Sequence, residues 1–295
     1  MYNNSDTIFP RNAETQPTTI LRMQNFMKAF TKAERKVAET VLSQLENTIY
    51  YSVTDLSEQA GVGETTVLRF CRKIGFKGYQ EFKLALAKEL VHPVKSLHQE
   101  VTEADDPIVI AQKVTATNIQ AIQATLGTLD PKQLERAVDL LTEANRIHFY
   151  GAGTSGVTAI DAKYKFLRIG LPIDTYTDAH VQAMAATTLK KGDVAVGISV
   201  SGSTKDTVDS LTLAKESGAA VICITHYARS PITKIANVVL LTAAKESPLQ
   251  GGALSSKIAQ LHVVDILHTA IAMRIRDKAL HYKEKTAKAV LNKIY

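Results

Sequence analysis

The sequence predicts an α/β protein with two parts: an N-terminal all-α helix-turn-helix domain, then a doubly wound parallel sheet covered by helices. Three observations carry this prediction. In the first part of the chain, apolar residues recur at helical spacing and glycines interrupt them. From residue 146 onward, short apolar runs alternate with amphipathic stretches. The length of 295 residues is about twice that of a usual domain, which favours two domains.

The composition limits the class of protein. Hydrophobic residues make up 45% and charged residues 22% of the chain, as is usual for proteins that bury a core. Cys71 and Cys223 are far apart and lie in apolar stretches, so we expect buried thiols rather than a disulfide framework or a metal site. The apolar runs have strand lengths, shorter than the roughly 18 residues that span a bilayer. No signal peptide is evident. We therefore expect a cytoplasmic protein without membrane partner, metal or cofactor.

Charge gives weak support for nucleic-acid binding at the level of the whole chain. The net charge is +6, but residues 1–105 contain 13 Lys/Arg and 13 Asp/Glu. The local distribution is more informative, because the stretch from Arg69 to Lys83 holds five basic residues and one acid, Glu81. A basic patch of this kind is what a DNA-binding surface requires.

The divisions of the chain follow from these patterns. We expect a mobile arm over 1–18, a helix-turn-helix domain over 19–94, a helical connector over 95–132, an α/β domain over 133–279 and a basic tail over 280–295. Helices of the first domain are expected over 33–45, 52–60, 62–74 and 79–90. Thr31 and Glu34 have capping-box spacing at the start of the first of these, and Gly61 separates the second from the third.

The α/β domain is expected to alternate strands with helices. The predicted strands are 147–150, 173–176, 194–200, 220–225 and 238–242. Several are nearly continuous apolar runs, which is typical of strands buried on both faces of a parallel sheet. Helices are expected to begin near Ser155, Ala179, Lys205, Ser230 and Ser255. In the connector, Asp130-Pro131 favours a helix start, because proline suits the first helical position.

The helices over 52–60 and 62–74 suit the major groove of DNA. Polar residues at the start of the second helix can reach base edges, while basic residues further along can bind phosphates. A small helical dimerisation or protein-docking domain is the alternative that this pattern leaves open.

The stretch from Ala60 to Lys83 resembles the DNA-binding domain of the RpiR/MurR family. The resemblance runs through Thr66-Val67, Arg69-Phe70 and the segment Gly75–Lys83. Gly63 departs from it, since the family usually has a serine cap there, but glycine caps a helix with a loss of only a few tenths of a kcal/mol. The resemblance implies binding of double-stranded operator DNA. The residues it implies are Gly63, Glu64, Thr65, Thr66, Arg69, Arg72, Lys73, Lys77 and Tyr79.

Two loops rich in glycine and hydroxyl groups follow predicted strands. Glycines in Tyr150–Gly156 let the backbone approach an anion, and the following helix offers unpaired N–H groups. As a dinucleotide-binding motif this loop fails, because no acidic residue follows at a suitable strand end. The second loop, Ser199–Thr204, offers four hydroxyls and a glycine before another helix. Two ordinary serine-glycine turns are the alternative.

Together the loops resemble the SIS (sugar isomerase) domain, whose Ser-x-Ser-Gly-x-Thr loop holds a sugar phosphate. The similarity covers about residues 134–279 and follows the helix-turn-helix in the order usual for the family. It implies a site formed by Gly153, Thr154, Ser155, Ser199, Ser201, Gly202, Ser203 and Thr204. Ser203 stands where many members have glutamate. Glu246 is a further candidate for contact with sugar hydroxyls, with a solvated loop glutamate as the alternative.

The resemblance implies a transcriptional regulator of sugar metabolism genes, and it includes amino-sugar phosphates such as N-acetylmuramic acid 6-phosphate among the effectors. A homodimer or tetramer is expected, because one small DNA-binding domain rarely suffices. The alternative is a phosphosugar isomerase or etherase that uses Glu246, His180 or His226 as a base. Against it, a DNA-binding domain has no purpose in a metabolic enzyme. We expect no catalytic residue.

Overall fold

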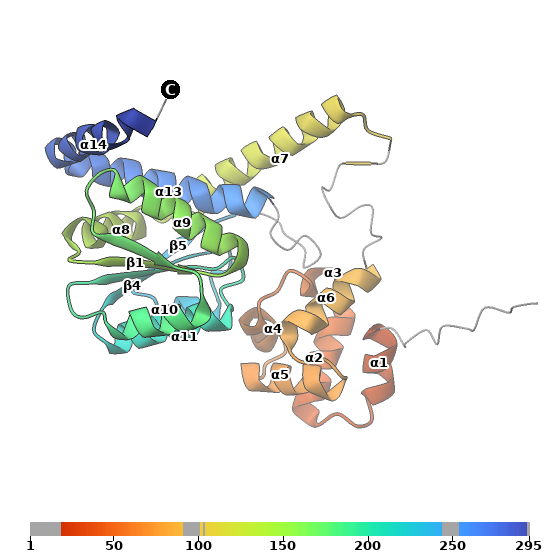
Figure 1. Ribbon diagram of the computed structural model, residues 1–295. Coiled ribbons are helices and arrows are strands. Elements are labelled where there is room, and N and C mark those ends of the chain that lie inside the picture. Colours follow the sequence, from red (N-terminus) through yellow and green to blue (C-terminus); the bar gives the residue numbers. More distant parts are fainter. Residues whose placement is uncertain (1–18, 91–100, 103, 244–253, 294–295) are drawn as a thin grey trace, which may run out of the picture.

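The computed structural model describes residues 19–90, 101–102, 104–243 and 254–293, which form a helical domain and an α/β domain (Figure 1). The predicted fold class is therefore confirmed. Helix α7 (Pro107–Thr128) connects the two in the chain and packs on α13 (Leu254–Arg274) of the α/β domain, where Ala121 meets Ala259. The expected arm over 1–18 and the expected domain end at residue 94 lie outside the described residues.

Polar side chains fix where helices of the first domain begin. The helices are α1 (Thr19–Phe26), α2 (Lys32–Ser43), α3 (Leu45–Thr48), α4 (Val53–Gln59), α5 (Glu64–Lys73) and α6 (Tyr79–Leu90). Thr31 and Glu34 form the predicted capping box before α2, and Ser52 and Asp55 form another at α4. Gly61 has a φ of 61°, in the left-handed region that favours glycine, and turns the chain between α4 and α5.

Aromatic rings form the centre of the first domain's core. Phe70 is fully buried on α5, and its ring centroid lies 5.3 Å from that of Phe30 and 5.6 Å from that of Phe82. Aromatic pairs at such separations contribute about 0.5–1.5 kcal/mol beyond the burial of their area. Cys71 is also fully buried, and this burial raises the pKa of its thiol to about 12. The thiol is therefore a core group, as predicted.

One parallel sheet organises the second domain. Its strands are β1 (Ile147–Gly151), β2 (Ile173–Tyr176), β3 (Val194–Ile198), β4 (Ala220–Thr225) and β5 (Val238–Leu241), in the spatial order β2-β1-β3-β4-β5. Every residue of β1 and β3 is buried, which accounts for their apolar sequences. The strand order reverses between β1 and β3, as in a doubly wound fold.

Helices cover both faces of the sheet (Figure 1). On one face, α8 (Pro131–Glu143), α9 (Gly153–Leu167) and α13 share a large apolar core with the strands. On the other face lie α10 (Ala179–Thr187), α11 (Lys205–Glu216) and α12 (Pro231–Ile235). The chain therefore winds around the sheet in both directions and buries it completely at its centre.

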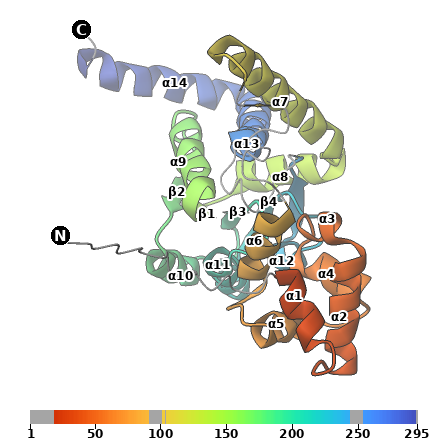
Figure 2. The same cartoon turned by 90° about the vertical axis from the view of Figure 1, so that its right-hand side faces the viewer.

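The predicted basic tail is helical. After α13 the chain bends by 110° and continues as α14 (Arg276–Val290) and a short 3₁₀ turn, Leu291–Lys293. Figure 2 places α14 and α7 at the end of the molecule away from the helix-turn-helix. In the described ranges no single helix is long and apolar enough to cross a membrane, and only the bent pair α13–α14 reaches that length and composition when counted together.

Candidate functional site

The two loops rich in hydroxyl groups lie side by side at the carboxyl edge of the sheet. Gly151 at the end of β1 is paired with Ile198 at the end of β3, so the residues that follow leave the sheet together. The first loop leads into α9 and the second into α11. This edge is where the strand order reverses, and open α/β sheets bind ligands at such a point.

Glycines determine the shape of the first loop. A Cβ on Gly151 would lie 2.8 Å from the carbonyl oxygen of Ser155, so only glycine allows the strand and the helix to meet this closely. Gly153 has a φ of 56°, in the left-handed region. Helix α9 begins after Ala152 with no side-chain cap, which leaves its first backbone N–H groups available to an anion.

Ser155 is held in place from α13. Gln260, which is 1% exposed, donates its amide to Ser155 Oγ at 3.1 Å and accepts from Thr158 Oγ1 at 3.2 Å. Because Ser155 Oγ accepts this bond, its own hydrogen can be donated to a ligand oxygen. The sequence does not predict the role of Gln260, since a glutamine in an apolar helix gives no local signal. Packing against α13 thus positions the buried hydroxyl of Ser155.

Hydrogen bonds between its own hydroxyls order the second loop. Ser199 Oγ lies 2.9 Å from Thr204 Oγ1, and Ser201 Oγ accepts from the backbone N–H of Ser203 at 3.2 Å. Gly202 makes the turn with a φ of 61°. Helix α11 begins after Thr204, again with no side-chain cap. The edge therefore presents hydroxyls, backbone N–H groups and the positive ends of two helix dipoles to an anion.

The donors at this edge are neutral. Lys205, the first residue of α11, is exposed and paired with Asp209 one turn further on. Within the part of the chain that the structure describes, no group of three or more His, Cys, Asp or Glu is arranged to hold a metal ion. Hydroxyls, backbone amides and helix N-termini are hydrogen-bond donors that can bind a phosphate group noncovalently.

The remaining candidates at this edge differ in their positions. His180 is exposed on α10. The Nδ1 atom of His226 lies 2.9 Å from the carbonyl oxygen of Thr242, and its backbone N–H donates to the carbonyl of Val200 at 3.1 Å. His226 therefore ties together the ends of β3, β4 and β5. Glu246 lies outside the described residues.

Helix α5 presents the candidate DNA surface. Thr65, Arg69 and Arg72 are exposed on it, as is Lys77 in the turn that follows. Gly63 is the N-cap residue and makes no side-chain capping bond. In helix-turn-helix proteins the start of the second helix enters the major groove, while basic residues bind the phosphates beside it.

The structure places two of the expected DNA contacts in the core. Thr66 is 7% exposed and Tyr79 is 4% exposed. Tyr79 begins α6 with its ring against Phe82, and its hydroxyl donates to the carbonyl of Tyr51 at 3.0 Å. A motif of this length includes residues that build the fold, and the motif alone does not separate them from exposed ones. We correct the prediction by leaving both side chains out of the DNA surface.

Two further residues of α5 are already paired. Lys73 Nζ lies 2.8 Å from a carboxylate oxygen of Glu34 on α2. Burial raises the pKa of Glu34, but hydrogen bonds from Lys73 and Thr31 outweigh it and hold that pKa below its usual value. Glu64 accepts from Thr54 Oγ1 at 2.5 Å and from Lys234 Nζ, in the α/β domain, at 2.7 Å. Arg69 and Arg72 are therefore the less restrained cations of this helix.

Comparisons with known proteins agree with this architecture. The model of the rpiR-family helix-turn-helix domain matches residues 18–93, and that of the SIS domain matches residues 140–270. An uncharacterized HTH-type transcriptional regulator of Caldanaerobacter subterraneus is 39% identical over 268 residues, which cover 91% of this chain and 95% of the relative. The chain belongs to the RpiR family of transcriptional regulators.

Two more proteins extend the similarity of this RpiR-family regulator. HexR, an HTH-type transcriptional regulator of Pseudomonas aeruginosa, is 36% identical over 253 residues, covering 86% of this chain and 88% of HexR. The structure of Vibrio vulnificus NanR complexed with ManNAc-6P superposes with a TM-score of 0.83 and 28% identity, and covers 94% of this chain and 100% of NanR. The combination of helix-turn-helix and SIS domain is thus shared along nearly the whole chain.

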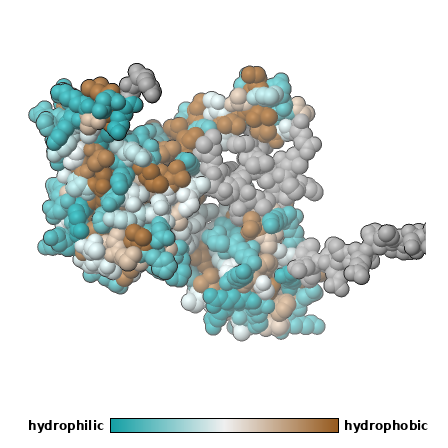
Figure 3. Space-filling model, in the orientation of Figure 1, coloured by the Kyte–Doolittle hydropathy of each residue, from teal (hydrophilic) through white to brown (hydrophobic). Residues whose placement is uncertain are grey.

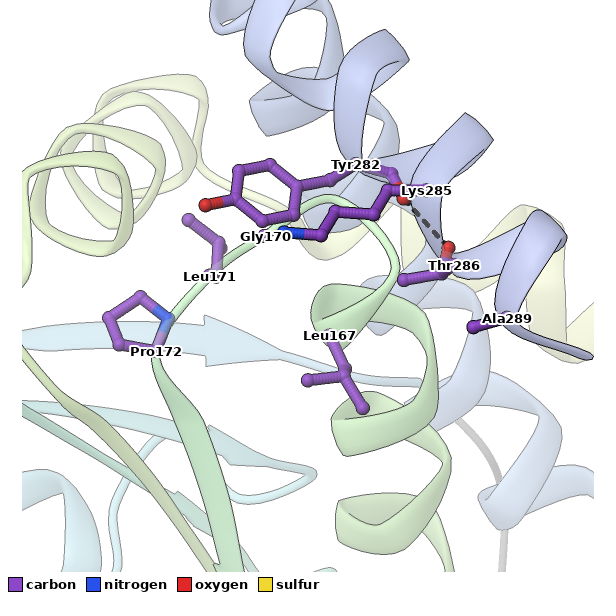
Figure 4. A pocket seen from close by; sticks show the side chains of 8 residues that line it. All are labelled: Leu167, Gly170, Leu171, Pro172, Tyr282, Lys285, Thr286 and Ala289. Carbon is purple, nitrogen blue, oxygen red and sulfur yellow. Dashed lines mark hydrogen bonds between the residues drawn. The ribbon is translucent and has the colours of Figure 1, made fainter.

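A pocket between the SIS domain and α14 lies at the other end of α9 from the first loop (Figure 4). Its volume is about 380 Å³, and it is lined by Leu167, Gly170, Leu171, Pro172, Tyr282, Lys285, Thr286 and Ala289. The Lys285 ammonium lies 5.9 Å from the centroid of the Tyr282 ring, and Thr286 Oγ1 bonds to the carbonyl of Tyr282. The pocket is therefore an apolar seam between α9 and α14 and lacks the hydroxyl cluster of the sheet edge.

Proposed function

We propose that this RpiR-family regulator binds operator DNA through α5, and binds a phosphorylated sugar between the loops after β1 and β3. The observation that carries the proposal is the convergence of two uncapped helix N-termini and a set of hydroxyls on one edge of the sheet. A phosphate there accepts hydrogen bonds from both loops and lies at the positive ends of two helix dipoles. We propose that the residues that bind this ligand are Gly153, Thr154, Ser155, Ser199, Ser201, Gly202, Ser203 and Thr204.

We propose an N-acetylated amino-sugar phosphate as the class of effector. In its support, NanR of Vibrio vulnificus, similar over nearly the whole chain, is complexed with ManNAc-6P. We propose no catalytic step at this site. The ring nitrogen of His226 that faces Thr242 is already committed to a backbone carbonyl. The relatives that match along the chain are named as transcriptional regulators.

We also propose that the regulator acts as a homo-oligomer. Val157, Ile160, Tyr164 and Leu167 are exposed at intervals of three and four residues and form an apolar stripe on α9. Figure 3 shows apolar patches on the surface of the α/β domain and along α7. Contiguous apolar surface of this kind marks protein interfaces. Two helix-turn-helix domains in one assembly would match a two-fold symmetric operator.

The ligand site is tested by thermal unfolding of the full chain with sugar phosphates. The panel holds ManNAc-6P, N-acetylmuramic acid 6-phosphate and glucose 6-phosphate, with the free sugars and inorganic phosphate as controls. At a concentration 100 times the dissociation constant, the true effector stabilises the folded chain by about 2.7 kcal/mol. The double variant Ser199→Ala/Ser201→Ala is expected to lose this gain.

The matched control for this experiment is Ser217→Ala. Ser217 lies at the other end of α11, where its hydroxyl donates to the carbonyl of Leu213. This control should respond to the effector like the wild type. If no sugar phosphate raises the melting temperature of the wild type, or if the loop variant still responds fully, the proposed site is wrong.

A further inference from the structure

One short segment of the SIS domain contacts the helix-turn-helix. We call residues 227–235, which comprise the end of the loop after β4 and helix α12, the coupling segment. Figure 2 shows α12 beside the helices of the first domain. The Arg229 guanidinium lies 3.2 Å from Asp55 and 2.5 Å from Glu58, both on α4. Ion pairs therefore join the coupling segment to the first helix of the helix-turn-helix.

Two more contacts reach the start of α5 and the cap of α4. Lys234 of α12 pairs with Glu64, the first residue of α5, at 2.7 Å. Ser52, the N-cap residue of α4, donates its hydroxyl to the carbonyl of Arg229 at 2.7 Å. The start of α5, which would have to enter the major groove, thus faces the SIS domain.

A buried lysine lies at the same junction. Lys83 is 5% exposed, and its Nζ donates to the carbonyl of Tyr51 at 2.7 Å. The ammonium lies 5.6 Å from the ring centroids of both Tyr79 in its own domain and Tyr227 in the coupling segment. Lys83 is therefore covered in part by the SIS domain.

The coupling segment also touches the candidate phosphate loop. The backbone N–H of Ile232 donates to the carbonyl of Gly202 at 2.9 Å. A Cβ on Gly202 would lie only 2.2 Å from Ser230 Oγ, so the loop and the start of α12 are in tight contact. Ser230 and Ile232 are fully buried. Since packed interiors do not deform continuously, a rearranged loop has to move α12.

We propose that the coupling segment holds the helix-turn-helix in a docked arrangement that weakens its binding to DNA, and that occupancy of the Ser199–Thr204 loop changes the strength of this docking. Both halves rest on the proposed function, the first on DNA binding through α5 and the second on the sugar-phosphate site. The contacts of Arg229 and Lys234 involve side chains that are 57% exposed. Exposed ion pairs are individually weak, so the docking can be released and a ligand can bias it.

The test compares DNA affinity with and without docking. Two full-length proteins are compared, the wild type and Arg229→Glu. Each is titrated with the same DNA duplex, which the wild type selects from a random-sequence library. We expect Arg229→Glu to bind this duplex about tenfold more tightly in the absence of sugar phosphate. A gain would be informative, because adding negative charge on its own weakens attraction to DNA. ManNAc-6P should change the DNA affinity of the wild type, but it should change that of Arg229→Glu by less than twofold.

Charge reversal and a distant arginine provide the controls. Arg229→Glu combined with Glu58→Arg restores the ion pair with position 58 but not the one with Asp55, so DNA affinity should return part of the way to the wild-type value, after correction for Glu58→Arg alone. Arg274→Glu breaks an exposed ion pair with Asp139 on the far side of the SIS domain and should leave DNA affinity unchanged. Circular dichroism checks folding, and Lys234→Glu provides a second variant that breaks the contact at Glu64.

The outcomes separate this proposal from the proposed function. If both Arg229→Glu and Lys234→Glu are folded and bind ligand-free DNA with wild-type affinity, the docking proposal is overturned. If the variants bind DNA more tightly but no sugar phosphate affects the melting temperature of the wild type, the docking holds and the effector assignment fails.

Discussion

The core of the helix-turn-helix and its contact with the SIS domain are built from opposite kinds of interaction. Inside the domain, fully buried rings of Phe70 and Phe82 contact each other, so separating them would expose apolar surface to water. At the contact, Arg229 and Lys234 reach across in ion pairs that solvent can screen. Separation of the two domains would therefore break polar contacts such as these ion pairs, and the proposed release from the SIS domain would leave the aromatic core of the helix-turn-helix intact.

The largest effect is expected in the aromatic core of the helix-turn-helix. Phe70→Ala removes the ring at the centre of the aromatic cluster and should destabilise the helix-turn-helix domain by about 3–5 kcal/mol. Calorimetry should show this as a lower melting temperature for one transition, while the SIS domain keeps its own. Leu68→Ala on the same helix is the control, because Leu68 is only partly buried and should lose much less. Equal losses in the two variants would contradict the assigned core.

A smaller effect is expected where the Ser199–Thr204 loop meets the coupling segment. Gly202→Ala forces a φ of 61° on a residue with a side chain and places its Cβ against Ser230. The strain should destabilise the SIS domain by about 1–3 kcal/mol and abolish the melting response to the effector. Gly127→Ala is the control, because a Cβ there has nothing within 4 Å and φ is not positive. Tolerance of alanine at Gly202 would show that the loop and α12 are not tightly packed.

The sequence predicts the parts of this architecture that depend on neighbours in the chain. Thr31 with Glu34, and the turn at Gly61, fix helix ends through bonds and torsions within a few residues. The apolar runs of β1 and β3 reveal buried strands, although β3 ends at Ile198 instead of Val200 because the chain turns there into the phosphate loop. Assignment of the two loops as a ligand site stays a prediction, and the structure shows that they share one edge.

Contacts between distant residues could not be predicted in this way. Gln260 supports Ser155 across 105 positions, and Arg229 reaches Asp55 across 174. Neither side chain stands in a local pattern that distinguishes it from an ordinary helix or loop residue. The burial of Tyr79 was missed for a related reason, because its neighbour Phe82 turns the start of α6 toward the core. Tertiary packing decides such positions.

The smallest effect is expected at Lys83, which is buried in the first domain and covered in part by Tyr227 of the SIS domain. Burial lowers the pKa of Lys83 to about 8 from 10.5, with Asp55 acting in the opposite direction. The unfolded chain therefore binds more protons than the folded chain between these values, and the contribution of Lys83 to stability rises with pH through that window. Between pH 7 and pH 9 the wild type should gain about 1 kcal/mol relative to Lys83→Met.

Urea unfolding of both proteins at the two pH values measures this difference. Comparison with Lys83→Met cancels the contributions of Cys71 and Tyr79, whose pKa values are raised by burial and which act in the opposite direction at higher pH. Because Tyr227 of the coupling segment covers the ammonium, Arg229→Glu should expose Lys83 and reduce the pH-dependent gain. An unchanged gain in Arg229→Glu would mean that Lys83 is buried by its own domain alone, and that docking contributes nothing to its environment.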